Sequence, residues 1–489
     1  MAVKLKELLF QNKSTRQTIT KNIFWLSFSQ IVSRLIRAGI IIYAARVLGA
    51  AEYGIFSYAL GLAAFFTVFA DIGIGAILTR EAAQKPAERS EYFATSLFLK
   101  SLLLAGTALL IIFVAPHFSK IEAAKALIPL VAFLTIFDGL RDLSVAFLRA
   151  KEKMEFEALI IITMNLAITV FGFLILSRYA TARALTFAYV ASTGFGMLLA
   201  IFILRDEFKK IFASFRKNLV RPIMNAALPI AVISLVGAFM LNTDLIMLGW
   251  WRSAQEIGFY SAGQKIIQVL YTLPAILASA LFPTMARFAA QKKDEEVGRI
   301  TEKGLTSTLL IALPLALGGI ILAKPIITLL YGREYLPAVN SFRVLTATLI
   351  IYFPSVLIPN LILAYNKQKK VVPFIAAGSA SNIIFNTILI PPLGIIGASI
   401  ATFFAQLTSN LPIWIMVRKI VHFQLLRNLK KIFAGVLLMG ATNLILVASG
   451  AHVLLNIALS GSVYFLALFL FKEKLIMEGL AMLKKAKTS

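Results

Sequence analysis

Apolar stretches of about 20 residues recur along the whole chain, and they limit its folds more than any other feature of the sequence. Of the 489 residues, 59% are hydrophobic and 15% are charged, which is too apolar for a soluble domain. A helix needs roughly 20 such residues to cross the hydrocarbon core of a bilayer. The pattern therefore predicts an all-α polytopic membrane protein with about 14 transmembrane helices.

Basic residues gather in alternate connections between the predicted spans. The chain carries 49 Lys and Arg residues against 23 Asp and Glu, for a formal charge of +26. Short basic loops stay on the cytoplasmic side, so we expect a multi-pass protein of the cell (cytoplasmic) membrane with both termini in the cytoplasm. Most of the positive charge then serves to orient the chain in the membrane. It favours anionic membrane lipids as partners and does not indicate nucleic acid.

Residue types that support metal or redox chemistry are scarce. Cysteine is absent, and the three histidines, at positions 117, 422 and 452, are far apart in the sequence. We therefore expect no disulfide, no metal site and no cofactor. The polar first 20 residues have no short apolar core and no cleavage site, so no removable signal peptide is expected.

A long basic connection divides the chain into two lobes, and a short sequence repeat supports the division. GAAEYGIFSYA (49–59) returns as SAQEIGFYSAG (253–263). Such a repeat predicts two six-helix lobes related by a pseudo-twofold axis along the membrane normal, as in alternating-access transporters; chance similarity of short turns is the alternative. The predicted segments are the cytoplasmic N-terminal segment 1–21, the N-lobe 22–204, the linker 205–221, the C-lobe 222–416, the basic connection 417–431, the helix pair 432–471 and the cytoplasmic tail 472–489.

Charged side chains deep inside the spans of the N-lobe are candidate functional residues, because each costs about 2.5–3.5 kcal/mol at a helix centre. Arg34 and Arg37 are three residues apart and share one face of the first span. Asp138, Arg141, Asp142 and Arg149 form a polar face on the fourth span, with Arg149 at its cytoplasmic end. Two such polar helix faces indicate the wall of a water-filled cavity. Ion pairs that hold the helices together without touching substrate remain the structural alternative.

Further charges fall within other predicted spans, namely Asp71, Lys100, Asp244, Lys265, Lys324 and Arg343. Snorkelling towards the outer surface explains Lys324. For Lys265 and Arg343, snorkelling and cavity lining explain the position equally well. Together with the arginines of the first lobe, these residues predict a mainly cationic cavity, which suits phosphate because Arg binds it bidentately and Lys acts as a point charge.

Several segments resemble one known family in order along nearly the whole chain: RVLGAAEYGIFSYALGL, DIGIGAILTRE (71–81), NTDLIMLGWW, LLYGREYLPAVNSFRVL (329–345) and PPLGIIGASIAT. They are similar to segments of the Wzx-like polysaccharide exporters, the lipid-linked oligosaccharide flippases. These belong to the multidrug/oligosaccharidyl-lipid/polysaccharide exporter superfamily, with the lipid II flippase and the MATE drug exporters.

The resemblance implies a V-shaped, two-lobe transporter that takes the headgroup of a polyprenyl-linked glycan into a cationic central cavity. By this resemblance the substrate-binding residues are Arg34 and Arg37, with Arg141, Lys265 and Arg343 as further candidates. In the lipid II flippase the last two helices form a lipid groove. Residues 432–471 carry no sequence signal for or against one.

The resulting expectation is a monomeric, non-enzymatic flippase that exports a polyprenyl-(pyro)phosphate-linked oligosaccharide or polysaccharide precursor by alternating access. No G-x-x-x-x-G-K-[ST] loop indicates ATP hydrolysis, so coupling would use Na+ or H+, with Asp71, Asp138, Asp142 and Asp244 as candidate acceptors. A MATE-like drug or metabolite exporter is the nearest alternative, although it would favour acidic and aromatic walls. A glycan polymerase would need a catalytic loop larger than any connection here, and a scaffold for envelope glycan enzymes predicts that Arg34 and Arg37 are dispensable.

Overall fold

The computed structural model describes all residues except 1–9, 13, 366, 424, 479–480 and 482–489. Throughout this part of the chain the regular structure is helical, with α-helices and short 3-10 helices and no strand. Within it, 11 helices are long and apolar enough to cross a membrane. The fold class predicted from the sequence, an all-α polytopic membrane protein, is confirmed.

The chain forms two compact units, Met1–Gly258 and Phe259–Ser489. The helices of unit 1 are α2 (Thr15–Ala70), α3 (Ile74–Gln84), η1 (Pro86–Glu88), α4 (Arg89–Phe113), η2 (Ala115–Phe118), α5 (Glu122–Lys125), α6 (Ile128–Ala150), α7 (Met154–Leu176), α8 (Ala182–Ile203), α9 (Arg205–Lys209), α10 (Ile211–Ser214) and α11 (Lys217–Trp251). Helix α12 (Ala254–Leu270) passes from unit 1 into unit 2.

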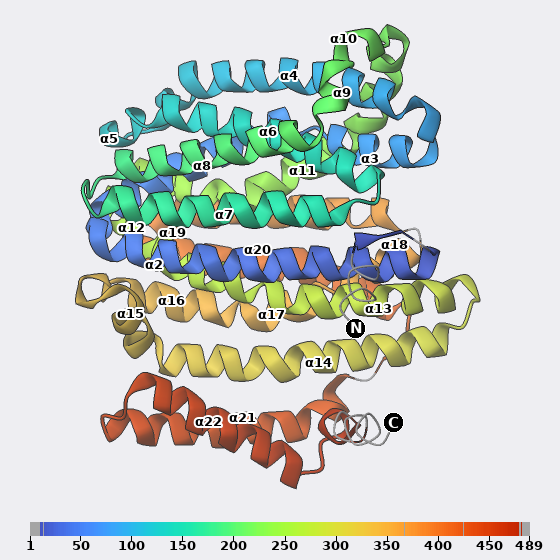
Figure 1. Cartoon of the computed structure of the whole chain (residues 1–489). Helices are drawn as coiled ribbons and strands as arrows, with labels where there is room; N and C mark the ends of the chain where they lie inside the picture. Colours follow the sequence, from blue (N-terminus) through green and yellow to red (C-terminus); the bar gives the residue numbers. More distant parts are fainter. Residues whose placement is uncertain (1–9, 13, 366, 424, 479–480, 482–489) are drawn as a thin grey trace. The chain divides into compact units, whose positions relative to one another are not determined.

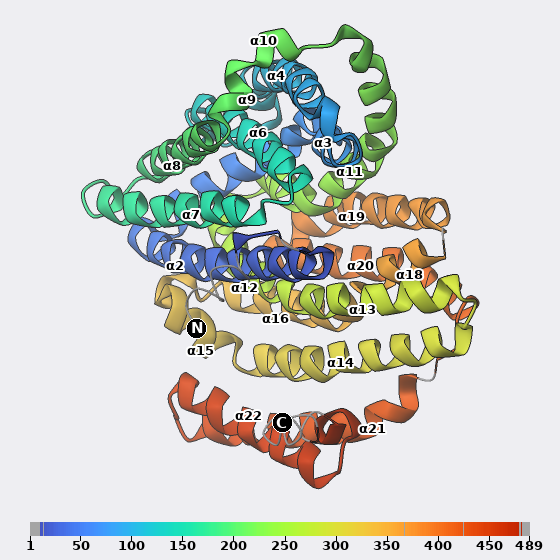
Figure 2. The ribbon, with the colours of Figure 1, turned by 45° about the vertical axis from the view of Figure 1, so that its right-hand side comes forward.

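The helices of unit 2 that follow are α13 (Thr272–Ala290), α14 (Asp294–Ile321), α15 (Ala323–Tyr331), η3 (Arg333–Tyr335), α16 (Ala338–Ala347), α17 (Leu349–Ser355), α18 (Ile358–Ala364), η4 (Gln368–Lys370), α19 (Val372–Leu393), α20 (Ile395–Arg418), α21 (Leu425–Ala448) and α22 (Val453–Leu470). The last two helices pack side by side, and α21 also packs on α14 (Figure 2). A hydrogen bond of 2.7 Å from the Tyr464 hydroxyl to the Leu310 carbonyl joins α22 to α14.

Helix α2 contains the first two predicted spans, joined at a glycine. Gly49 has φ 69° and ψ 173°, a left-handed conformation that glycine adopts without strain. The second span is itself interrupted, because α2 ends at Ala70 and α3 begins only at Ile74. Gly73 lies in this joint with φ 88°, and a Cβ there would meet the Ile230 side chain at 2.7 Å. Both backbone angle and packing therefore favour glycine at position 73.

The two copies of the sequence repeat contact each other reciprocally within unit 1. A Cβ at Gly54 would lie 1.7 Å from the Ala254 carbonyl oxygen, and a Cβ at Gly258 would lie 1.9 Å from the Ala50 carbonyl oxygen. Contacts of this kind, in which each partner offers the same two positions, are what a local twofold axis produces. Close packing between the two copies therefore explains why small residues, Ala and Gly, occupy the matched positions of the repeat.

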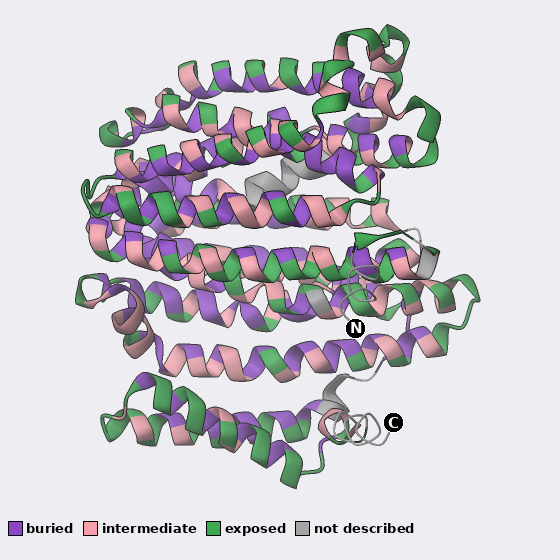
Figure 3. Cartoon of the chain, viewed as in Figure 1, coloured by how far each residue is buried: buried purple, intermediate pink, exposed green. Residues whose placement is uncertain are grey.

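One apolar cluster in unit 1 is formed by buried residues of α3, α4, α6, α7, α8 and α11. Helix α11 packs on α2, α3 and α4, so it lies in unit 1 although the sequence repeat makes it the start of the second lobe. Exposed residues alternate with buried ones along the long helices (Figure 3). Large apolar side chains such as Leu102 and Phe113, 64% and 65% exposed, are expected on surfaces that face hydrocarbon.

Candidate functional site

Arg34 and Arg37 lie in the first half of α2, and both side chains are exposed. The Arg37 guanidinium carbon is 5.9 Å from the centroid of the Tyr189 ring on α8, within the range of a cation–π interaction. In the part of the chain that the structure describes, Arg37 makes no ion pair closer than 4 Å. Its charge nevertheless lies near enough to the Asp138 carboxylate to interact with it. Both arginines are thus exposed on this span.

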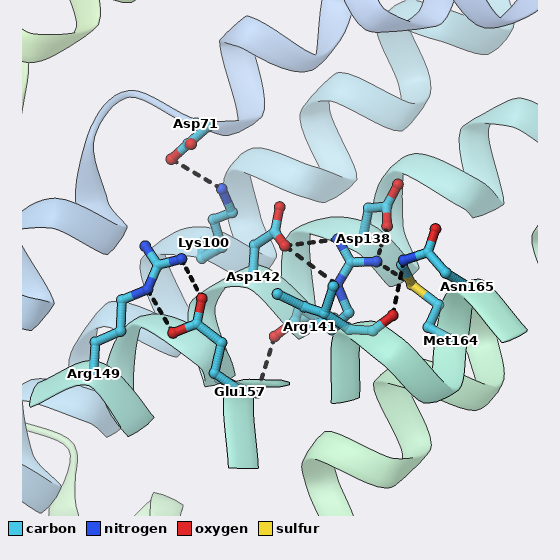
Figure 4. A network of polar contacts seen from close by, with 12 residues as sticks. Asp71, Lys100, Asp138, Arg141, Asp142, Arg149, Glu157, Met164 and Asn165 are labelled. Atoms are coloured by element: carbon cyan, nitrogen blue, oxygen red, sulfur yellow. Dashed lines mark hydrogen bonds and ion pairs between the residues drawn. The ribbon is translucent and has the colours of Figure 1, made fainter. Parts of the chain in front are cut away.

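Arg141, in contrast, is enclosed by partners on its own helix and the next one (Figure 4). Its guanidinium lies 2.5 Å from an Asp138 oxygen and 2.7 Å from an Asp142 oxygen, and it also contacts the Met164 sulfur of α7. The Arg141 side chain is 11% exposed, whereas that of Asp142 is 63% exposed. The cation is therefore enclosed, the Asp142 carboxylate is exposed, and Asp138 is intermediate.

A second pair repeats this order. The Lys100 ammonium on α4 is 3.2 Å from an Asp71 oxygen, and the two side chains are 4% and 59% exposed. Asp71 caps the end of α2, with its backbone N–H donating to the carbonyls of Thr67 and Val68. Sequence reasoning placed Asp71 inside an unbroken span and missed the joint, for which the Gly73 beside it was the available signal.

Other ion pairs enclose their carboxylates. Arg149, at the end of α6, donates two hydrogen bonds to Glu157 of α7, whose side chain is completely buried. Lys21 at the start of α2 lies 2.9 Å from Glu155, and its side chain is also completely buried. The sequence indicated only Arg149, at the cytoplasmic end of the polar face on the fourth span. The other three charges stand at the ends of predicted spans and look like solvated loop residues.

The connection after α8 is attached to the same end of unit 1. Glu207 of α9 accepts hydrogen bonds from the Lys151 ammonium at 2.6 Å and from the Ser90 hydroxyl at 2.7 Å. Partial burial alone would raise the pKa of Glu207, but these hydrogen bonds outweigh it and hold the pKa below its usual range.

The remaining candidates lie apart from these clusters along the chain. In unit 2, the half-buried Lys265 donates a hydrogen bond of 3.2 Å to Gln268, one turn further along α12. Arg343 is exposed and donates to the Ile320 carbonyl at 3.2 Å and to the Asn340 side chain at 3.1 Å. Asp244 on α11 is 2% exposed.

The structure thus brings Asp138, Arg141 and Asp142 into direct contact, with Arg37 close by, and joins Asp71 to Lys100. Arg141 lies in close ion-pair contact with both Asp138 and Asp142. Among the described residues, no three His, Asp or Glu side chains gather in a way that would hold a metal ion.

Helix lengths, the interrupted spans and charges inside the helices define a polytopic membrane protein of the transporter type. Comparison with known proteins agrees with this class. The structure is similar to that of a lipid II flippase MurJ in an inward closed conformation, with a TM-score of 0.75 and 18% identity over 92% of this chain and 99% of that one. An inward-facing multidrug resistance MATE family transporter matches with a TM-score of 0.58 and 14% identity, over 82% and 98% of the two chains.

Residues 19–289 match the family described as "Polysaccharide biosynthesis protein", and the chain belongs to this family. Residues 229–388 also match the MatE family, which agrees with membership of the wider exporter superfamily. Among curated relatives, the Haloferax volcanii protein named "Probable low-salt glycan biosynthesis flippase Agl15" is 22% identical over 381 residues, covering 77% of this chain and 79% of the relative.

Proposed function

We propose that the chain is a flippase that moves a polyprenyl-(pyro)phosphate-linked oligosaccharide or polysaccharide precursor across the cytoplasmic membrane by alternating access. The observation that carries the proposal is the pair of exposed guanidinium groups, Arg34 and Arg37, on one face of the first span in a member of the polysaccharide biosynthesis family. A diphosphate that leaves water needs strong replacement donors, and Arg supplies two parallel N–H bonds to one phosphate.

Arg141, Lys265 and Arg343 are proposed as further substrate-binding cations. They differ in which protein contacts each must release before it can bind substrate. Arg343 is exposed, and Lys265 would have to exchange its hydrogen bond to Gln268. Arg141 would first have to release a carboxylate, because Asp138 and Asp142 both hold it.

Asp138 and Asp142 are the favoured coupling groups among the four proposed acceptors, which also include Asp71 and Asp244. Two carboxylates share one guanidinium on Arg141, so uptake of H+ or Na+ would relieve their mutual repulsion and loosen Arg141. Ion uptake and the release of a substrate-binding cation would then be one event. This is the physical basis for coupling an ion gradient to glycan export.

The lipid portion of the substrate also has a proposed place. A cavity of about 400 Å³ in unit 2 is lined almost wholly by apolar side chains of α12, α14, α15, α16, α21 and α22, including Leu310, Pro314, Met439 and Ile457. Such a surface suits hydrocarbon. We further propose that the protein works as a monomer with both termini in the cytoplasm, in accord with the basic connections between alternate spans.

The test is export of the glycan by cells that depend on this chain, or complementation of a flippase-deficient strain. The double variant Arg34→Gln/Arg37→Gln should abolish export while the protein reaches the membrane at normal levels. The matched control is Arg178→Gln/Arg183→Gln, which removes two exposed arginines, one from the connection between α7 and α8 and one from the first turn of α8. Unchanged export in the first variant would overturn the proposal and favour a scaffold.

A second candidate, ion-coupled export of cationic compounds, is favoured by one specific observation. The carboxylates of Asp71 and Asp142 face the open side of unit 1, and residues 229–388 match the MatE family. Cells expressing the chain would then resist cationic drugs, and Asp142→Asn would remove the resistance. Glycan export without any gain in resistance decides for the flippase.

A further inference from the structure

Lys100 is a cation held deep in unit 1 with a carboxylate over its open side. Its ammonium lies 3.2 Å from Asp71, and its side chain is almost entirely buried while that of Asp71 is mostly exposed. A buried Lys without an anion is costly, so some anion must accompany it. The exposed fraction of Asp71 shows that this anion can be reached from outside the helix bundle.

Ion pairs elsewhere in unit 1 show how a purely structural pair is built. The carboxylate of Glu157 is completely enclosed beside Arg149, and that of Glu155 is 11% exposed beside Lys21. In both, the anion cannot be replaced without opening the packing of the helices. Asp71 differs from both, because its carboxylate is 59% exposed beside an enclosed cation.

The backbone around Asp71 is also unlike that of the structural pairs. Asp71, with φ −122° and ψ 73°, belongs to the non-helical joint between α2 and α3, which Gly73 completes in a left-handed conformation. Glu155 and Glu157 stand within the regular helix α7. A side chain on a joint can move by rotation of a few backbone angles, whereas one inside a helix cannot do so without breaking hydrogen bonds.

We propose that Lys100 is a phosphate-binding residue that Asp71 covers until the substrate arrives. The phosphate of the anionic headgroup replaces the Asp71 carboxylate as the partner of the Lys100 ammonium, and Asp71 turns away on the joint. No covalent bond changes, and the charge around Lys100 stays balanced in both states. The inference rests on the proposed function, because it presumes that the transported headgroup is a phosphate.

The exchange explains why a cation this deep is kept in a membrane helix. A phosphoryl group that links lipid to sugar carries one negative charge, as a carboxylate does, but accepts more hydrogen bonds, so it can displace Asp71 once the rest of the headgroup is bound by exposed arginines such as Arg37. The movement of Asp71 then changes the conformation of the joint between α2 and α3 when substrate is bound. Substrate binding and a change of the second span become linked.

The experiment measures binding of farnesyl diphosphate, a short isoprenoid diphosphate, to the purified full-length protein in detergent. Asp71→Asn removes the competing carboxylate and should bind the probe several-fold more tightly than wild type. Lys100→Gln/Asp71→Asn leaves no unpaired buried charge and should bind about tenfold more weakly than Asp71→Asn, as expected for loss of one charged hydrogen bond.

The matched control is Lys21→Gln/Glu155→Gln, which removes a pair with an enclosed carboxylate and should leave binding within about twofold of wild type. If wild type binds the probe and Arg37→Gln weakens binding, but the Lys100→Gln/Asp71→Asn protein binds as tightly as Asp71→Asn, then Lys100 only anchors helices and this inference alone fails. If wild type does not bind the probe, both this inference and the proposed function are overturned.

Discussion

Replacement of Gly54 by alanine tests the reciprocal contact between the two copies of the sequence repeat. The added Cβ would lie 1.7 Å from the Ala254 carbonyl oxygen, and real Cβ atoms essentially never come closer than 3.0 Å to another atom. The atom that it meets belongs to the backbone, so no side-chain rotation relieves the overlap. The two segments must separate by at least about 1.3 Å, the difference between these distances.

Two energies of opposite sign decide the outcome. Alanine stabilises a helix relative to glycine by about 0.5–1 kcal/mol. Overpacking of a close contact costs about 1–3 kcal/mol, and here the cost lies at the upper end, because separation at Gly54 also opens the matching contact of Gly258 with Ala50. The net expectation is a loss of stability of about 2 kcal/mol.

The assay is thermal unfolding of the purified protein in detergent, followed by tryptophan fluorescence. Trp250 is a suitable reporter because its ring N–H donates a hydrogen bond of 2.7 Å to the Phe118 carbonyl in unit 1. Gly106→Ala is the matched control, since a Cβ there would meet nothing within 4 Å. It should keep or raise the unfolding midpoint.

The double variant Gly54→Ala/Gly258→Ala sharpens the test. Once the first alanine has separated the segments, the second should cost clearly less than it does alone, since neighbouring substitutions share one structural change. A Gly54→Ala protein as stable as wild type, or additive losses in the double variant, would refute the reciprocal contact as described.

Three further predictions concern individual contacts, each measured as the midpoint of thermal unfolding. Arg149→Met leaves the enclosed carboxylate of Glu157 without its partner and should cost about 3–5 kcal/mol; Glu157→Gln added to it should restore most of the loss, and no rescue would argue against the pair. Glu207 has a lowered pKa, so its contact with Lys151 stabilises the protein above the unfolded pKa and is lost as pH falls through the folded one. Acidification should therefore lower the midpoint less in Glu207→Gln than in wild type, and equal slopes would contradict this. Tyr464→Phe removes the hydrogen bond to α14 and should cost about 1 kcal/mol, a result that an unchanged midpoint would exclude.

Much of the fold could be predicted from the sequence because a bilayer leaves few choices. The lengths of the apolar stretches determine helices, and the basic connections indicate orientation. The spacing of Arg34 and Arg37 also places both on one helix face without any knowledge of their neighbours. Their exposure in the structure agrees with that spacing.

Tertiary structure alone decided which charges are accessible. Helical periodicity places Arg141 and Asp142 on either side of Asp138, about 100° apart, and does not say which of the two is enclosed. The cation is enclosed and the Asp142 carboxylate is exposed because of helices such as α7 that pack against α6. The complete burial of Glu157 could not be predicted either, and the joint at Gly73 packs against Ile230, a residue remote in the sequence. The sequence by itself determined a helical membrane protein with charges in its spans; packing between distant segments decided which of those charges a substrate can reach.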